Sequence, residues 1–458
     1  MSTVLQAYRY ALDPTPAQLV ALGRHAGAAR FAFNWGLARV KAAMDQRAAE
    51  VTYGVPEAER TPVPWTMPTL RRQWNDAKGE VASWWPECSS KETYSAGLDQ
   101  LACGLKAFSD SRKGRRKGRR VGFPRFKKRG KARDSFRYTT GAYGPDGDRH
   151  VKLPRIGRVK VHEPMGALTG RLDAGTARLR GATVSRTAGR WFVSFTVQVA
   201  RDLPDAPSRR QRKGGTVGVD LGVRCLAVLS TGERVPNPKH LDAALGRLRR
   251  ASRAYARSKP GSVGRRKRAA WLARIHARVA GRRRDGLHKL TTRLATSHDV
   301  VVVEDLHVAG MVRNRRLARG VSDTGMAEVR RQLTYKTTWY GSRLIVADRW
   351  YPSSKTCSGC GWRNPSLTLS DRTFVCQDCA LVIDRDYNAS LNLRRLATGT
   401  GVAGDPGAYA PNARGADRKT PPAGRVAVKR EPRTARAGKT GTAARRQAAA
   451  ELMIAHDH

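Results

Sequence analysis

The chain has 458 residues, of which 87 are lysine or arginine and 37 are aspartate or glutamate, so its formal net charge at pH 7 is +50. Solubility alone needs a net charge of only about 2 to 8 in a small domain, so this excess indicates a polyanionic partner, nucleic acid before any other. No apolar run approaches the roughly 18 residues of a membrane span and no signal-peptide core opens the chain, which predicts a cytoplasmic protein without a membrane partner.

The first 130 residues predict one strand followed by helices. Residues 4–11 alternate loosely like a short strand, and Thr15 before Pro16 then predicts a helix N-cap and first helical position. Apolar residues recur at helical spacing between residues 19 and 37, from residue 69, and between residues 92 and 109. We therefore expect a helical domain over residues 12–130.

A dense basic run covers residues 112–133 and contains two phenylalanines among its cations. Such a segment can stack bases on its rings while its charges hold phosphates. The candidate nucleic-acid contacts in this run are Arg119, Arg120, Phe123, Arg125, Phe126, Lys127 and Lys128. The alternative is a disordered basic loop whose phenylalanines only anchor it to the core, because a charge run alone defines no partner geometry.

Short alternating segments between Gly and Pro turns fill residues 131–200 and predict an antiparallel barrel or sheet. A polar linker follows over residues 201–214. From residue 215 the order of elements is three strands, helices rich in arginine, a strand of four valines ending at Glu304, a helix, a strand and, after an insertion, a last helix. We expect three separate helices before the valine strand. The arginine-rich stretch is a further candidate for gripping a nucleic-acid backbone, in particular through Arg282, Arg283 and Arg284.

The insertion carries two Cys-x-x-Cys pairs, Cys357 with Cys360 and Cys376 with Cys379. This spacing is typical of a zinc ribbon, in which four thiolates surround one Zn²⁺ and leave no position open for chemistry. The predicted zinc is therefore structural. Unrelated buried cysteines or two disulfides are the alternative. The other three cysteines are scattered, as expected in a reducing compartment.

Three acids stand where this order of elements would bring them together. Asp220 lies inside an apolar strand, Glu304 ends the valine strand, and Asp386 opens the last helix. Converging carboxylates suit Mg²⁺ or Mn²⁺, and two such ions activate water and stabilise the leaving oxygen in phosphodiester hydrolysis. Two alternatives stay open from the residues alone. Asp305 competes with Glu304 for the inward position, and Asp384 can serve either as helix cap or as ligand beside Asp386.

Six segments of the chain resemble the TnpB (OrfB) family of insertion-sequence proteins, relatives of type V CRISPR effector nucleases. They are residues 33–37, 122–127, 218–222, 303–306, 351–361 and 384–392. The last three are the specific ones. In this family, Asp220, Glu304 and Asp386 would be the RuvC triad, with Asp386 preferred over Asp384 because it directly precedes the x-Asn-Ala element, and the four cysteines would be the zinc ribbon.

The resemblance implies a multidomain α+β protein. Residues 12–130 would form a helical recognition domain with a basic loop, and residues 1–11 would supply the first strand of a wedge-like β-barrel completed by residues 131–200. Residues 215–348 and 384–397 would form a ribonuclease-H-like (RuvC) α/β nuclease domain, with the zinc ribbon inserted at 349–383. The basic tail, residues 398–458, has too few large apolar groups to bury and is expected to be disordered.

The function implied by the resemblance is RNA-guided cleavage of double-stranded DNA, with a guide RNA from the transposon end. Base pairing would then supply specificity while the protein reads charge and shape. Two alternatives remain. A strand-transferring transposase would use the same ions, and a guide-dependent DNA-binding regulator would bind without cutting.

Overall fold

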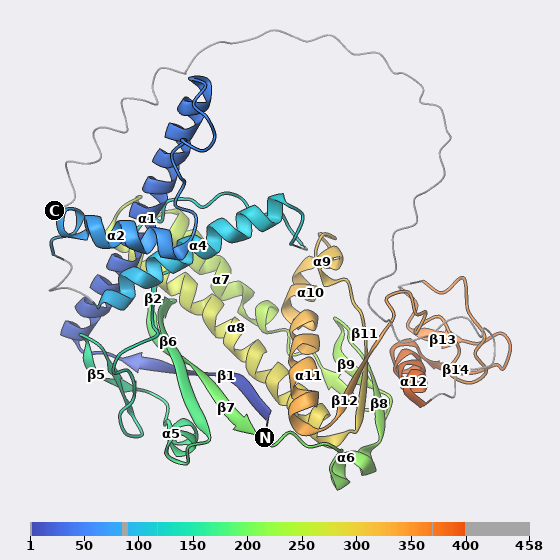
Figure 1. Cartoon of the computed structure of the whole chain (residues 1–458). Helices are drawn as coiled ribbons and strands as arrows, with labels where there is room; N and C mark the ends of the chain where they lie inside the picture. The colour runs from blue at the N-terminus through green and yellow to red at the C-terminus, as the bar shows by residue number, and fades with distance from the viewer. Residues whose placement is uncertain (1, 85–89, 117, 369, 399–458) are drawn as a thin grey trace, which may run out of the picture. The chain divides into compact units, whose positions relative to one another are not determined.

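A computed structural model of the chain describes residues 2–84, 90–116, 118–368 and 370–398 (Figure 1). The predicted disordered tail, residues 398–458, lies outside the described residues except for Thr398. The described residues form an N-terminal helical group, a seven-stranded sheet, a five-stranded sheet covered by helices and a two-stranded ribbon. Within this part of the chain, no helix is both long and apolar enough to span a membrane.

The N-terminal helices are α1 (Pro16–Thr52), α2 (Met67–Val81) and α4 (Lys91–Arg112). Helix α1 begins as predicted, because the Thr15 hydroxyl accepts the Gln18 N–H and the Gln18 side chain accepts the Thr15 N–H in a capping box. Helices α1 and α4 pack closely at Gly97, where an added Cβ would lie 2.2 Å from the Ala29 carbonyl oxygen. The three helices predicted here are confirmed.

The seven-stranded sheet has the order β2-β6-β7-β1-β5-β4-β3. Its strands are β1 (Ser2–Asp13), β2 (Ser135–Tyr138), β3 (Gly144–Pro145), β4 (His150–Leu153), β5 (Gly157–Val161), β6 (Ala177–Thr187) and β7 (Arg190–Arg201). The N-terminal strand therefore joins this sheet, as expected, and lies between β7 and β5.

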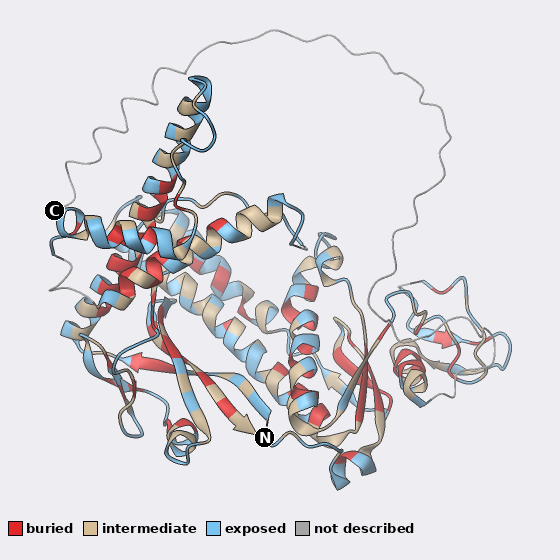
Figure 2. Cartoon of the chain, in the orientation of Figure 1, coloured by how far each residue is buried: buried red, intermediate tan, exposed pale blue. Residues whose placement is uncertain are grey.

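The predicted barrel is not confirmed, because the edge strands β2 and β3 do not pair and the sheet stays open. The seven-stranded sheet does not need to close into a barrel to bury its apolar face. Leu22 and Ala26 of α1, together with Met165 and Leu168 at the short helix α5 (Gly166–Asp173), share one hydrophobic cluster with the strands. Figure 2 shows buried residues gathered along these strands and helices.

The five-stranded sheet has the order β10-β9-β8-β11-β12. Its strands are β8 (Thr216–Asp220), β9 (Cys225–Leu229), β10 (Arg234–Pro236), β11 (Val300–Glu304) and β12 (Arg343–Ala347). Strand β9 is antiparallel to β8 and β10, whereas β11 is parallel to β8 and β12. The predicted succession of these strands along the chain, three before the long helices and two after them, is confirmed.

Helices cover both faces of this sheet. The helices of this part of the chain are α6 (Arg209–Gly214), α7 (His240–Ala256), α8 (Val263–Ser297), α9 (Val308–Met311), α10 (Ala318–Thr324), α11 (Met326–Tyr340) and α12 (Arg385–Thr398). Val301 and Val303 of β11 pack against α8 and α11 on one face. Val300 and Val302 pack on the other face against Leu393 of α12.

One prediction about helices was wrong. Helix α8 is continuous over 35 residues, although a break was expected before residue 287; its interior Gly281 and Gly286 have open space around them and do not interrupt it. The segment predicted as a polar linker ends in α6, where the buried Gln211 side chain donates to the carbonyls of Ala295 (2.7 Å) and Tyr340 (2.8 Å). The ribbon strands are β13 (Thr373–Val375) and β14 (Val382–Asp384), which pair antiparallel around the buried Phe374.

Candidate functional site

Asp220 and Glu304 lie side by side at the same end of the five-stranded sheet. They end the parallel neighbours β8 and β11, and the register pairs the preceding residues, Val219 and Val303. Side chains alternate between the faces of a strand. Since Val219 and Val303 face α8 and α11, both acids face the opposite side, which α12 covers.

Helix α12 approaches this face through Gly218. A Cβ at Gly218 would lie 2.0 Å from the Ser390 carbonyl oxygen and 2.6 Å from the Arg394 nitrogen, so only glycine permits this contact. Asp386 precedes Ser390 by four residues and therefore lies on the same side of the helix, one turn nearer the carboxyl ends of the strands. The three predicted acids thus come from three elements in mutual contact, β8, β11 and α12, and Figure 1 shows α12 beside the sheet.

The electrostatics of Asp220 reflect this convergence. Burial, and then the negative charges of Glu304 and Asp386, raise its pKa well above the usual range, and the nearby Arg385 offsets only part of this effect. Burial also raises the pKa of Glu304, although its carboxylate accepts a hydrogen bond from the Ser353 hydroxyl. The site holds more negative charge than the adjacent arginine neutralises, which suits a divalent cation with oxygen ligands.

The two neighbouring acids have other partners. Asp384 caps α12, since one of its oxygens accepts the N–H groups of Asp386 (3.1 Å) and Tyr387 (3.0 Å) while the other pairs with Arg234 (3.1 Å). This is the cap role left open for Asp384.

Asp305 turns outward, pairing with Arg349 (2.7 Å) and with Arg330. Glu304 therefore takes the inward position. Asp386 pairs with Arg385 at 3.1 Å.

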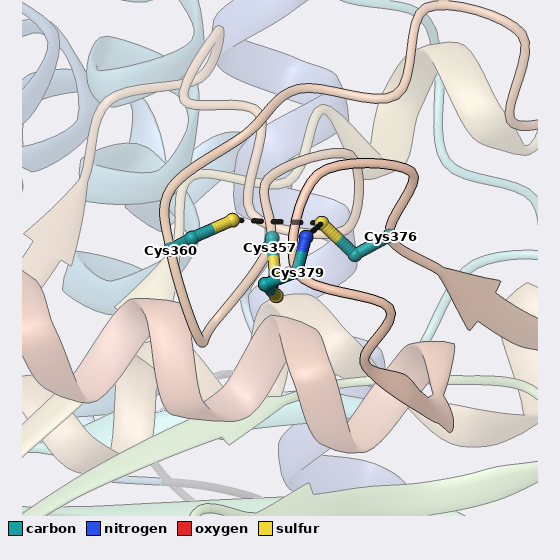
Figure 3. A group of neighbouring side chains, drawn as sticks. All are labelled: Cys357, Cys360, Cys376 and Cys379. Carbon is teal, nitrogen blue, oxygen red and sulfur yellow. Dashed lines mark hydrogen bonds between the residues drawn. The ribbon is translucent and has the colours of Figure 1, made fainter.

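The four cysteines form a compact cluster (Figure 3), in which the four sulfur atoms lie within 4.8 Å of one another. The Sγ atoms of Cys357 and Cys379 are 3.6 Å apart and those of Cys360 and Cys376 are 3.5 Å apart, far beyond the roughly 2.05 Å of a disulfide bond. Backbone N–H groups of Gly359 and Cys379 point at the sulfurs of Cys357 (3.3 Å) and Cys376 (3.4 Å). This arrangement can hold one metal ion. Among the described residues it is the one group of three or more candidate ligands packed so closely, so the three carboxylates are more widely spaced.

Two asparagines connect the cysteine cluster to α12. Buried Asn388 accepts the N–H of Ser358 (2.9 Å), which lies between Cys357 and Cys360, and donates to the Thr356 carbonyl (2.7 Å). One turn on, buried Asn392 donates to the carbonyls of Thr356 (2.6 Å) and Ser353 (2.7 Å).

The same segment reaches the carboxylates, because the Ser353 hydroxyl bonds Glu304. Sequence reasoning assigned no role to Ser353 or Asn392; their only signal was their place in segments that resemble the family.

Comparison with known proteins matches three family descriptions: "Helix-turn-helix domain" over residues 1–48, "Probable transposase" over residues 173–315, and "Cas12f1-like, TNB domain" over residues 327–393. The first two are models for OrfB proteins. Three curated relatives share the name "Putative RNA-guided DNA endonuclease". A Mycobacterium tuberculosis protein is 40% identical, covering 91% of this chain and 92% of its own length. A Streptomyces pristinaespiralis protein is 35% identical (96% and 99%), and Escherichia coli K12 InsQ is 30% identical (87% and 93%).

The chain belongs to the TnpB (OrfB) family. Among solved structures, the Cas12f1–sgRNA–target DNA complex is similar, with 13% identity, coverage of 86% of this chain and 99% of that chain, and a TM-score of 0.42. In this TnpB-family chain, the region described as helix-turn-helix consists of strand β1 and the single helix α1.

Two segments that resemble the TnpB family meet in the helical domain. The Asn34 side chain clamps the Lys127 backbone, accepting its N–H (2.8 Å) and donating to its carbonyl (3.0 Å). The Lys127 ammonium lies 3.8 Å from the centre of the Phe33 ring and 2.5 Å from the Gln100 amide oxygen. Burial, then the charge of Arg30, lower its pKa to about 8. This lysine therefore holds the basic segment to the helices.

The other predicted nucleic-acid contacts fall into two groups: side chains that pack or pair within the protein, and side chains that are exposed to solvent. Phe123 packs against Trp65 and Phe108, with ring centroids 6.3 and 5.2 Å away, as in the anchoring alternative. Arg283 pairs with Asp323 (3.4 Å). The remaining candidates expose their side chains to solvent: Arg119, Arg120, Arg125, Phe126, Lys128, Arg282 and Arg284. These seven stay predicted contacts.

Proposed function

We propose that this protein is an RNA-guided DNA endonuclease that cuts target DNA by metal-dependent phosphodiester hydrolysis in a ribonuclease-H-like (RuvC) domain. The observation that carries the proposal is the approach of Asp220, Glu304 and Asp386 at one end of the five-stranded sheet, where burial and the other two acids raise the pKa of Asp220. The curated relatives, all named as RNA-guided DNA endonucleases, support the guide and the substrate.

Asp220, Glu304 and Asp386 would hold the catalytic magnesium or manganese, which supplies a nucleophilic hydroxide and stabilises charge on the leaving oxygen. The protein's own part is positioning. Strand register holds Asp220 beside Glu304, Ser353 orients the Glu304 carboxylate, and Gly218 allows α12 to bring Asp386 to them. Asp384 contributes by starting α12 at a defined residue.

The four cysteines would hold a structural zinc, since four thiolates leave a tetrahedral ion no open position. Its contribution is to fold the ribbon around Phe374 and to keep the first Cys-x-x-Cys turn in place against α12.

The net charge of +50 supports two nucleic-acid partners, a guide RNA from the transposon end and the double-stranded target. The seven exposed candidates in the basic segment and on α8 would contact their phosphates and bases. Because base pairing supplies the specificity, these contacts are expected to tolerate any target sequence.

The test uses protein purified with the RNA that accompanies it, that RNA sequenced, and a DNA duplex matched to it. We expect wild type to cut in the presence of magnesium. Asp220→Asn should lower the cleavage rate at least 100-fold while RNA and target affinities change little. Asp285→Asn is the matched control, because that acid is exposed and its one ion pair among the described residues is with Lys289 on its own helix.

The products distinguish the alternatives. Free 3′ hydroxyl ends support hydrolysis, whereas 3′ ends joined to a second DNA would identify a strand-transferring transposase. Binding of matched targets by wild type without any cleavage would identify a DNA-binding regulator.

A further inference from the structure

Trp350 exposes 84% of its surface, in the turn that follows β12. A tryptophan usually buries most of its large apolar ring, and tryptophan is enriched at interfaces, where one side of the residue meets a partner. The turn lies beside the proposed nuclease site. Arg349, the preceding residue, pairs with Asp305 next to Glu304, and Ser353, three residues on, bonds Glu304 itself.

The turn is anchored on both sides of the indole. The Asp348 side chain accepts the backbone N–H of Trp350 (2.8 Å), and the Asp348 carbonyl accepts the backbone N–H of Tyr351 (3.1 Å). Tyr351 packs with Val300 and Leu393 under the sheet, and its hydroxyl bonds the Asn392 carbonyl (3.2 Å). The exposure of Trp350 is therefore built into an ordered turn, and its neighbours are used to hold it there.

We propose that Trp350 is a stacking platform for an unpaired base of the DNA strand beside the scissile phosphate. This inference rests on the proposed nuclease function. An indole face stacks on every base, so it can position a strand without reading its sequence. A site directed by a guide must accept whatever base reaches it, and hydrogen-bonding side chains would discriminate among bases.

The adjacent charges agree with this ligand. Arg349 and Arg330 each remain 44% exposed although both pair with Asp305, so two guanidinium groups stay accessible near this turn, which also carries the Asp348 carboxylate. A strand stacked on Trp350 would carry its phosphates past these guanidinium groups toward Glu304. A hydrophobic protein partner would gain less binding free energy from these exposed guanidinium groups.

The binding test uses the Asp220→Asn protein with its RNA and a target carrying 2-aminopurine at successive positions around the cut. Stacking quenches the fluorescence of this base. We expect quenching at one or two positions near the cut, its loss in Asp220→Asn/Trp350→Ala, and its retention in Asp220→Asn/Trp350→Phe. Tyr53→Ala is the matched control, because Tyr53 is 85% exposed at the end of α1.

The cleavage test uses the single variants. Base–aromatic stacking contributes about 1 to 3 kcal/mol, so Trp350→Ala should slow cleavage about 5- to 150-fold while guide affinity stays unchanged and Trp350→Phe recovers most of the rate. Equal quenching and equal cleavage in Trp350→Ala would overturn the proposal, as would a change confined to oligomeric state, which would indicate a protein partner. If wild type did not cut but the quenching still depended on residue 350, the nuclease function would fail and the stacking site would stand.

Discussion

The contact between β8 and α12 gives the sharpest test of how the carboxylates are positioned. In Gly218→Ala, the new methyl group would lie 2.0 Å from the Ser390 carbonyl oxygen and 2.6 Å from the Arg394 nitrogen, where ordinary contacts begin near 3.4 Å. Both atoms belong to the α12 backbone and cannot rotate away as a side chain would. The helix must therefore move from the sheet by about 1 Å, and Asp386 moves with it.

The expected losses of cleavage rate and of stability follow from this displacement. A misplacement of about 1 Å at a reacting centre costs on the order of 100-fold in rate, and forcing a methyl group into a packed contact costs about 1 to 3 kcal/mol of stability. We expect Gly218→Ala to lower the single-turnover cleavage rate about 100-fold. Guide binding should persist, because the exposed basic candidates lie on other elements.

The assay compares single-turnover cleavage, RNA affinity and thermal unfolding of Gly218→Ala with those of Gly246→Ala. Gly246 lies within α7 with nothing near its added methyl group, so alanine there should leave cleavage unchanged and stabilise the helix by about 0.5 to 1 kcal/mol. Cleavage by Gly218→Ala within a few-fold of wild type, with unchanged unfolding, would refute the reasoning.

Three further predictions concern the ribbon and a buried lysine. Asn388→Ala leaves the Ser358 N–H unpaired and removes one of the two side-chain donors to the Thr356 carbonyl, so zinc affinity in chelator competition should fall about 10- to 100-fold, whereas Asn364→Ala, which removes a turn contact to Ser366, should change it little. Removing the metal with a chelator should increase hydrogen exchange of the ribbon while the β6–β7 pairing stays protected; unchanged exchange in the ribbon would contradict a structural metal. Burial, partly offset by Glu328, lowers the pKa of Lys336 to about 8 from an unfolded value near 10.5. Between these pH values the unfolded state binds the extra proton, so stability should rise with pH by up to about 1.4 kcal/mol per unit, and Lys336→Met should remove that slope.

Much of the candidate site could be predicted from local pattern. In β8 and β11 each acid directly follows a valine that faces α8 and α11, so strand period places Asp220 and Glu304 on the same side once the parallel register of the two strands is known. The capping pair at Thr15 and Pro16 likewise specified the start of α1. These features depend on residues within a few positions of one another.

Features that depend on distant contacts could not be predicted. Phe123 and Phe126 look equivalent among their cations, yet the first packs against Phe108 and the second is 46% exposed. Lys127 resembles its neighbour Lys128, but Asn34, 93 residues earlier, turns it inward. The barrel was overpredicted for the same reason, because α1 supplies the cover that closure would have provided.

The position of the ribbon within the chain explains how it is connected to two of the carboxylates, one through the segment before it and one through the helix after it. It is inserted between β12, which ends the sheet, and α12, which carries Asp386, so the last acid is reached only through the metal-binding segment. An insertion tethered only at its ends would leave α12 free to shift. Here the segment that leads into the ribbon bonds Glu304 through Ser353, and the first cysteine turn bonds Asn388 two residues after Asp386. A metal that orders this turn therefore restrains two of the three carboxylates, although its own ligand set leaves no position for catalysis.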